Sequence, residues 1–179
     1  MWRGCLLSLI GFIAFQLLDS AFGRELYSIL RTTALTIFYH LAVRLALGEW
    51  MVDRFKAECF DYERPWFQVG AREASLYRRL GVHRWKGGVP TYSPEEFSIE
   101  KHSLEEIARA TCRAEVVHEF NAAVSFVPLL FAIPFGAFPV FLLTSMAAAA
   151  FDLIFVLVQR YNRPRLVRLM QMQEKRRRN

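Results

Sequence analysis

The stretch AAVSFVPLLFAIPFGAFPVFLLTSMAAAAFDLIFVLV, residues 122–158, decides the fold class of this chain. It is 37 residues long and carries a single charge, Asp152. A helix crosses a bilayer with about 20 apolar residues, so this stretch is about twice as long as one crossing requires. Two prolines and a glycine within 134–139 are typical of a tight turn. The sequence therefore predicts a helical hairpin with arms at about 120–135 and 137–158, the first arm being short for a full crossing.

Two further apolar stretches lie near the N-terminus. Residues 4–23 are apolar except for Asp19, and residues 33–48 are a weaker candidate because they contain His40 and Arg44. The first stretch has the outline of a cleaved signal peptide, but its apolar run is longer than a usual signal core and no A-x-A site follows. We therefore expect it to be retained as a membrane anchor.

Composition and charge predict how the remaining residues are placed. The chain is 54% hydrophobic and 15% aromatic, yet its mean hydropathy is only +0.17, so the apolar residues are concentrated in a few segments. The basic tail 160–179 holds eight Lys and Arg against one Glu, and residues 49–118 hold eleven Lys and Arg against twelve Asp and Glu. The positive-inside rule counts Lys and Arg, so it predicts that both regions and both termini face the cytoplasm.

These features together predict an all-α integral membrane protein that forms one domain over residues 1–179. It would have about four transmembrane or re-entrant helices and a cytoplasmic interfacial helical layer over 49–118. In that layer aromatic residues alternate with Arg and Lys, as in helices that lie among lipid headgroups. The membrane segments and the acidic balance of the layer argue against nucleic acid as a partner.

Residues 86–94, KGGVPTYSP, combine two glycines with two prolines and are predicted to form a loop. A simple turn and a close approach of the backbone to a ligand both remain open for this loop. The three cysteines are unevenly spaced and form no C-x-x-C motif, so neither a disulfide framework nor a metal site is expected.

The clearest amphipathic helix is SLEEIARATCRAEVVHEF, residues 103–120, whose Ser103 and Glu106 form a capping-box start. Glu115 and His118 are three residues apart and share one face of this helix. A carboxylate beside an imidazole is a standard general-base pair, although the same pair also serves helix packing. The Glu-x-x-His motif also supplies half of the ligands of a di-iron carboxylate site. Such a site needs a second copy of the motif, and the sequence contains none.

His40 and Arg44 are four residues apart and share a helix face inside the second apolar stretch. Ionisable groups within a membrane segment cost several kcal/mol unless they are paired, so they are functional candidates by default. The alternative is that His40 only bonds a neighbouring carbonyl group.

The chain leaves its last apolar segment through VQRYNRPRLVRLM, residues 158–170. We expect Pro164 to end the regular helix and Arg160, Arg163 and Arg165 to spread at the level of the lipid headgroups. Such arginines either stop a membrane segment on the cytoplasmic side or bind an anionic or sugar-bearing headgroup. The polar residues interspersed among them favour binding.

Four stretches resemble the glycosyl-4,4'-diaponeurosporenoate acyltransferase family. They are YHLAVR (39–44), LYRRLGVHRWKGGVP (76–90), ATCRAEVVHEF (110–120) and QRYNRPRL (159–166), and the resemblance extends over about residues 39–169. Members of this family are small bacterial membrane proteins that attach a fatty acyl chain to the glucose of a carotenoid glycolipid. His83 and Glu119 depart from the family pattern, which has Lys and Trp at these positions.

The resemblance implies an acyltransferase of the bacterial cell membrane that esterifies a sugar hydroxyl of a membrane glycolipid, such as a carotenoid glycoside. No bound cofactor is implied, and the partners would be that acceptor and an acyl donor, such as the thioester acyl-CoA. His118 would be the general base, Glu115 would orient it, and Arg113 or Lys86 would stabilise the oxyanion or hold donor phosphates. The residues expected to bind substrate are Trp85, Lys86, Gln159, Arg160, Tyr161, Asn162, Arg163, Arg165, His40 and Arg44.

Without the family resemblance, the residues are also compatible with two other classes of function. One is a non-catalytic membrane scaffold or lipid-binding protein that uses the same basic residues. The other is a different lipid-modifying membrane enzyme, such as a hydrolase or a desaturase-like oxidase. The three classes differ in what a His118 substitution does to membrane lipids and in whether iron is bound.

Overall fold

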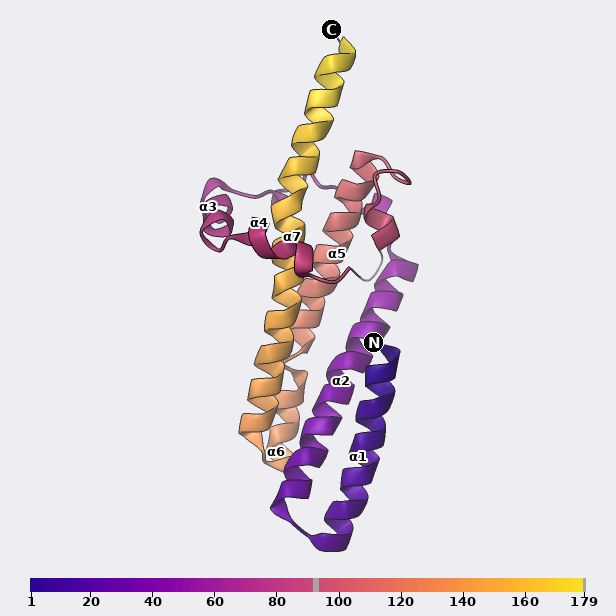
Figure 1. Cartoon of the computed structure of the whole chain (residues 1–179), viewed down its shortest axis with the longest axis vertical. Helices are drawn as coiled ribbons and strands as arrows, with labels where there is room; N and C mark the ends of the chain where they lie inside the picture. Colours follow the sequence, from indigo (N-terminus) through magenta and orange to yellow (C-terminus); the bar gives the residue numbers. More distant parts are fainter. Residues whose placement is uncertain (92–93, 179) are drawn as a thin grey trace. The chain divides into compact units, whose positions relative to one another are not determined.

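The structure is a computed structural model, and it describes residues 1–91 and 94–178 (Figure 1). Across these residues every regular element is a helix and no strand occurs. Four helical stretches are long and apolar enough to cross a membrane. They are α1 (Trp2–Phe22), α2 (Glu25–Arg54), the stretch Leu104–Phe131 that begins with α5, and α7 (Phe138–Arg178). The predicted all-α class with four such helices is confirmed.

The chain divides into two compact units. Unit 1 contains Met1–Val52 and Phe120–Asp152, and unit 2 contains Asp53–Glu119 and Leu153–Asn179. The helices α5 (Leu104–Val124) and α7 each contribute residues to both units. The organisation of the chain as one membrane domain with a cytoplasmic layer stays a prediction.

In unit 1, α1 and α2 form an antiparallel hairpin (Figure 1). Gly23 ends α1 in the left-handed conformation, with φ 57°, and its N–H donates to the Asp19 carbonyl at 2.8 Å. Glycine adopts this conformation without the steric cost of a side chain. Across the hairpin, Arg31 donates to the Asp19 carboxylate at 2.8 Å. A Cβ placed on Gly4 would lie 3.3 Å from Leu41, so the two helices approach each other closely at this end.

The predicted second apolar segment, 33–48, lies entirely inside the 30-residue helix α2. The predicted turn of the last hairpin is confirmed, since Gly136 and Ala137 have φ angles of 68° and 53° and separate α6 from α7. The arm before the turn is divided among the end of α5, η5 (Val127–Phe131) and α6 (Ala132–Phe135). Pro128 lies in η5, and because it has no N–H it favours a break in the α-helical pattern here.

Unit 2 begins with short elements that lead into α5. They are η1 (Ala57–Cys59), η2 (Pro65–Phe67), α3 (Ala71–Arg79), α4 (Val82–Trp85), η3 (Lys86–Gly88) and η4 (Pro94–Phe97). Of the predicted loop 86–94, residues 86–88 form one turn of 3-10 helix, residues 89–91 have no regular structure, and Pro94 begins η4. Positions 92–93 lie outside the described residues. The predicted capping box is confirmed, because the Ser103 N–H donates to Glu106 Oε2 at 2.8 Å and the Glu106 N–H donates to Ser103 Oγ at 3.2 Å.

The prediction that Pro164 ends the last regular helix is wrong. α7 continues through Pro164 to Arg178. A proline inside a helix removes one hydrogen bond and crowds the carbonyl four residues earlier, at a cost of about 3 kcal/mol. Side-chain contacts of Arg160 and Arg163, described below, fix the helical turn that precedes the proline and offset this cost.

Candidate active site

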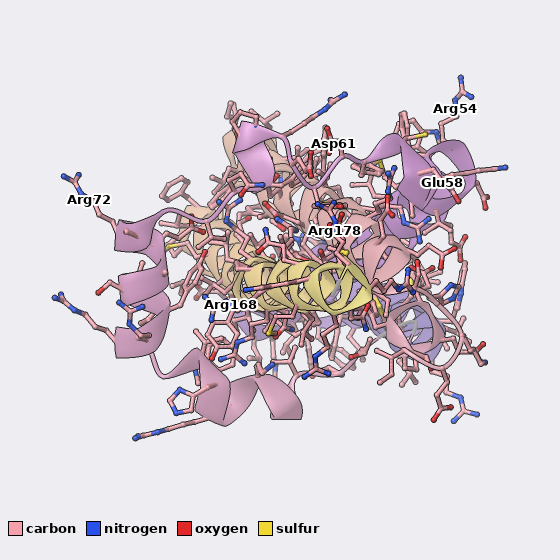
Figure 2. The ribbon with its side chains drawn as sticks, turned by 90° about the horizontal axis from the view of Figure 1, so that it is seen from above. Arg54, Glu58, Asp61, Arg72, Arg168 and Arg178 are labelled. Atoms are coloured by element: carbon pink, nitrogen blue, oxygen red, sulfur yellow. The ribbon has the colours of Figure 1, made fainter. Side chains whose placement is uncertain are left out.

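Unit 2 brings together most of the residues predicted to act on substrate, from three parts of the chain. α5 supplies Arg113, Glu115 and His118, α7 supplies the run 159–165, and the segment from α4 to η3 supplies Trp85 and Lys86. Arg72 of α3 is exposed, and its side chain points away from the ribbon (Figure 2).

Glu115 is fully buried, with 0% of its surface exposed, and lies between two arginines of α7. Its Oε1 accepts a hydrogen bond from Arg160 Nη1 at 2.6 Å, and its Oε2 accepts one from Arg163 Nη2. Arg160 and Arg163 are three residues apart, so they lie on the same side of α7. A buried carboxylate that bridges two guanidinium groups keeps its charge compensated.

Arg163 is 1% exposed and donates hydrogen bonds to three different groups. Besides Glu115, it reaches Thr111 Oγ1 through Nε at 3.0 Å and the Phe67 carbonyl through Nη1 at 2.9 Å. Its guanidinium also lies over the Phe67 ring, 5.1 Å from the ring centre. These contacts join α7 to α5 and to the short η2 turn inside unit 2.

Arg160 also binds a second carboxylate, that of Glu73 in α3. Arg160 Nη2 donates to Glu73 Oε2 at 2.9 Å, and Nε donates to Glu73 Oε1. This bond from Arg160 is the main reason that the pKa of Glu73 lies below its usual value. The Tyr77 hydroxyl donates to the same carboxylate, and burial raises the pKa of Tyr77. Glu73 was not predicted as part of the site.

Arg113 and His118 have surroundings different from those of Glu115. Arg113 forms an ion pair with Glu96 of η4, with Nη2 and Oε2 2.5 Å apart. The ring of His118 stacks on the ring of Phe155, with ring centres 4.5 Å apart and planes 11° apart. Residues 113 and 115 are two positions apart on α5 and point to different sides of the helix, and the guanidinium groups that contact Glu115 belong to α7.

Lys86 and the end of the 159–165 run form a second cluster. Lys86 Nζ donates to Asn162 Oδ1 at 2.6 Å and lies 5.3 Å from the centre of the Tyr161 ring. Arg165 lies 4.2 Å from the centre of the same ring and donates to the Tyr161 hydroxyl. Burial and the positive charge of Arg165 both lower the pKa of Lys86. The structure thus joins four residues of the predicted substrate-binding set.

Two further predicted residues lie in unit 2. Trp85 is half-buried, and its indole N–H donates to the Leu80 carbonyl at 3.1 Å, which closes the short turn between α3 and α4. Gln159 is half-buried on α7. Their assignment to substrate binding stays a prediction.

His40 and Arg44 belong to unit 1. Arg44 forms a buried ion pair with Asp152 and also donates to the Ala148 carbonyl at 2.8 Å and to Ser125 Oγ at 3.2 Å. His40 is 6% exposed, and its two ring nitrogens have no hydrogen-bond partner among the described residues. The sequence contained a signal for this ion pair. The apolar segment 33–48 contains one cationic residue, Arg44, and the apolar segment 122–158 contains one acidic residue, Asp152.

The fold and these contacts define a small helical protein that has four helices long and apolar enough to cross a membrane and a cluster of cations in unit 2. A family model described as "CrtO: Glycosyl-4,4'-diaponeurosporenoate acyltransferase" matches residues 57–172, and the chain belongs to this family. The protein is therefore an acyltransferase, and family membership implies a glycosyl carotenoid acceptor and an acyl donor. The resemblance predicted from the sequence is confirmed, although the matched range begins after the YHLAVR stretch.

No curated protein and no solved structure gives a significant match to the chain. The matched range includes all the predicted site residues of unit 2 and leaves out His40 and Arg44.

Proposed function

We propose that this protein esterifies a sugar hydroxyl of a glycosyl carotenoid with a fatty acyl chain taken from a thioester such as acyl-CoA. The observation that carries the proposal is the family match over residues 57–172, which includes the run Arg113–His118 and the motif 159–165. The four long apolar helices suit an enzyme whose acceptor dissolves in the membrane.

In this mechanism His118 is the general base. Its neutral imidazole takes the proton from the sugar hydroxyl as the hydroxyl oxygen bonds to the thioester carbonyl carbon. The carbon–sulfur bond then breaks, the thiolate leaves, and the proton held by His118 returns to the sulfur. Proton transfer by a placed side chain contributes about 10²–10⁴-fold to a rate. Stacking on Phe155 limits the rotation of the His118 ring, which supports a fixed direction for proton transfer.

Glu115 and Arg113 act through other residues in this proposal. Both carboxylate oxygens of Glu115 accept hydrogen bonds from arginines, which suits a positioning residue that fixes the turn of α5 carrying His118. Arg113 is the candidate donor to the oxyanion of the tetrahedral intermediate. Its ion pair with Glu96 compensates part of its charge, so it would stabilise the oxyanion less than an unpaired arginine would.

The experiment that tests the proposal compares membrane lipids by mass spectrometry in cells with the wild-type protein, with no protein, with His118→Ala, and with His83→Ala. His83 is an exposed histidine outside the proposed site, so His83→Ala is the matched control. We expect one glycosyl carotenoid to lose a fatty acyl mass in the strain without protein and in the His118→Ala strain. The His83→Ala strain should keep that mass.

Two other results would count against the proposal. If His118→Ala lipids match wild type while the protein is present at normal levels, His118 is not the base. If even the strain without protein has unchanged lipids, acyl transfer to that lipid does not depend on this chain.

We also propose that both termini and residues 49–118 face the cytoplasm of a bacterial cell, because Lys and Arg are concentrated in 49–118 and in 160–179. Cys59 is exposed and lies in the first of these regions, whereas Cys5 and Cys112 are buried. A membrane-impermeant thiol reagent should therefore leave Cys59 unmodified in intact cells and modify it in inside-out vesicles. Modification in intact cells would reverse the proposed orientation, and Cys59→Ser controls for reaction at the other two thiols.

A further inference from the structure

The cations of the 159–165 run and of η3 fall into two groups with different neighbours. Arg160 and Arg163 form ion pairs with the carboxylates of Glu73 and Glu115. Lys86 and Arg165 form no ion pair with any carboxylate in the described part of the chain, and their polar partners are an amide and a phenol. Among the residues that the structure describes, no carboxylate therefore compensates these two neighbouring positive charges.

The two uncompensated cations share one aromatic ring. Lys86 Nζ lies 5.3 Å and the Arg165 guanidinium 4.2 Å from the centre of the Tyr161 ring. Asn162 Oδ1 fixes the Lys86 ammonium at 2.6 Å, and Tyr77 packs edge-on against Tyr161 with ring centres 6.5 Å apart. Like charges held close together raise the energy of the protein alone, and an anion that binds between them lowers it.

Two glycines follow Lys86, and the space beside them is open. A Cβ added to Gly87 or Gly88 would meet no atom within 4 Å, and neither residue is among the glycines with positive φ. Neither packing nor backbone conformation therefore requires glycine at these positions. Glycine also allows a ligand to come close to the backbone, and this use is compatible with the open space.

We propose that Lys86 and Arg165, held by Tyr161 and Asn162, form a binding site for a phosphate group. A guanidinium and an ammonium are the usual partners of phosphate, since arginine can bind two phosphate oxygens at once and lysine adds a point charge. The phosphate comes either from the acyl donor, whose thioester carrier bears phosphate groups, or from the headgroup of an anionic lipid. Only the donor assignment rests on the proposed acyl transfer.

The test measures binding to the purified full-length protein with two probes. Coenzyme A represents the phosphates of the donor and is titrated by isothermal calorimetry. Vesicles of phosphatidylcholine with or without phosphatidylglycerol represent the lipid headgroup. The amount of phosphatidylglycerol that copurifies with the protein is measured as well, and its excess over phosphatidylcholine is the phosphatidylglycerol enrichment. The variants are Lys86→Gln and Arg165→Gln, and the matched control is Arg84→Gln, which removes an exposed cation two residues from Lys86.

We expect each of the two variants to weaken binding of one probe by about tenfold or more, which is the size of a lost charge-assisted hydrogen bond. Arg84→Gln should stay within about twofold of wild type. Loss of coenzyme A binding assigns the site to the donor, and loss of phosphatidylglycerol enrichment assigns it to lipid. Wild-type binding of both probes by both variants would overturn the proposal.

Two more variants separate this site from other effects. Gly88→Ala should fold normally, because its Cβ would meet no atom of the described residues within 4 Å, but it should weaken binding if the ligand comes close to the backbone. His118→Ala should bind the probe as wild type does even when turnover is lost. Failure of the phosphate site and failure of the acyl-transfer mechanism would therefore give different results.

Discussion

The two groups of cations in unit 2, Arg160 with Arg163 on α7 and Arg165 of α7 with Lys86 of η3, differ in their surroundings. Arg163 is 1% exposed and donates to three acceptors, whereas Arg165, two residues later, is exposed and lies against one tyrosine. The first group of positive charges is neutralised by the protein and builds the fold of unit 2. The second is left to bind something else, so a basic motif has to be divided by its partners before a function is assigned to it.

The largest effect should come from removing the shared carboxylate of the first group. Glu115→Ala leaves Arg160 and Arg163 without this buried counter-charge, and loss of one partner of a buried ion pair costs about 3–5 kcal/mol. The free energy of unfolding of the purified protein in mild detergent, followed by circular dichroism, measures the loss. Glu105→Gln is the control, because it breaks an exposed pair with Arg109 on the same helix and should cost well under about 1 kcal/mol. Equal stability of the two variants would show that the buried pair does not hold the fold.

A loss of stability of intermediate size should distinguish Arg163 from Arg165, the two arginines that flank Pro164. Lysine cannot reproduce the three differently directed bonds of Arg163, so Arg163→Lys should destabilise the protein by about 1–3 kcal/mol. Arg165→Lys keeps the charge at an exposed position and should change the free energy of unfolding by less than about 0.5 kcal/mol. The same unfolding measurement applies, and a larger loss for Arg165→Lys would reverse the comparison.

The smallest effect should appear in how the stability contributed by the ion pair of Arg160 with Glu73 depends on pH. The pKa of Glu73 is lowered in the folded protein, mainly by its bond from Arg160, so the folded state favours the ionised carboxylate. This contribution to stability is fully present above the ordinary value of 4.5 and is lost as pH falls through the lower folded pKa. Glu73→Gln should therefore lose less stability than wild type between neutral pH and this acidic range. Parallel curves for the two proteins would show that Glu73 does not contribute to the pH dependence of stability.

Features set by neighbouring residues could be predicted from the sequence. The apolar segments, the turn at Gly136 and the capping box of Ser103 and Glu106 each depend on residues close together in the chain. The structure agrees with these predictions because short-range hydrogen bonding and chain flexibility decide them. The resemblance of scattered motifs to one family was likewise visible in the sequence.

The charge partners within unit 2 could not be predicted in this way. Arg160 binds Glu73 at a separation of 87 residues, and Arg163 binds Glu115 at a separation of 48. Helical spacing gives only the neighbours on the same helix, so it placed Glu115 beside His118 and gave no indication of its two arginines on α7. The continuation of α7 through Pro164 was missed for the same reason, because the contacts that offset the cost of the proline come from α3, α5 and η2.

The most direct measurement is the turnover of purified protein supplied with a fatty acyl-coenzyme A and a glycosyl carotenoid. The proposed mechanism predicts that acylated glycosyl carotenoid and free coenzyme A form in equal amounts. His118→Ala should lower kcat by about 10²–10⁴-fold while His83→Ala remains near wild type. A His118→Ala enzyme within about threefold of wild type would contradict the assignment of His118 as the general base.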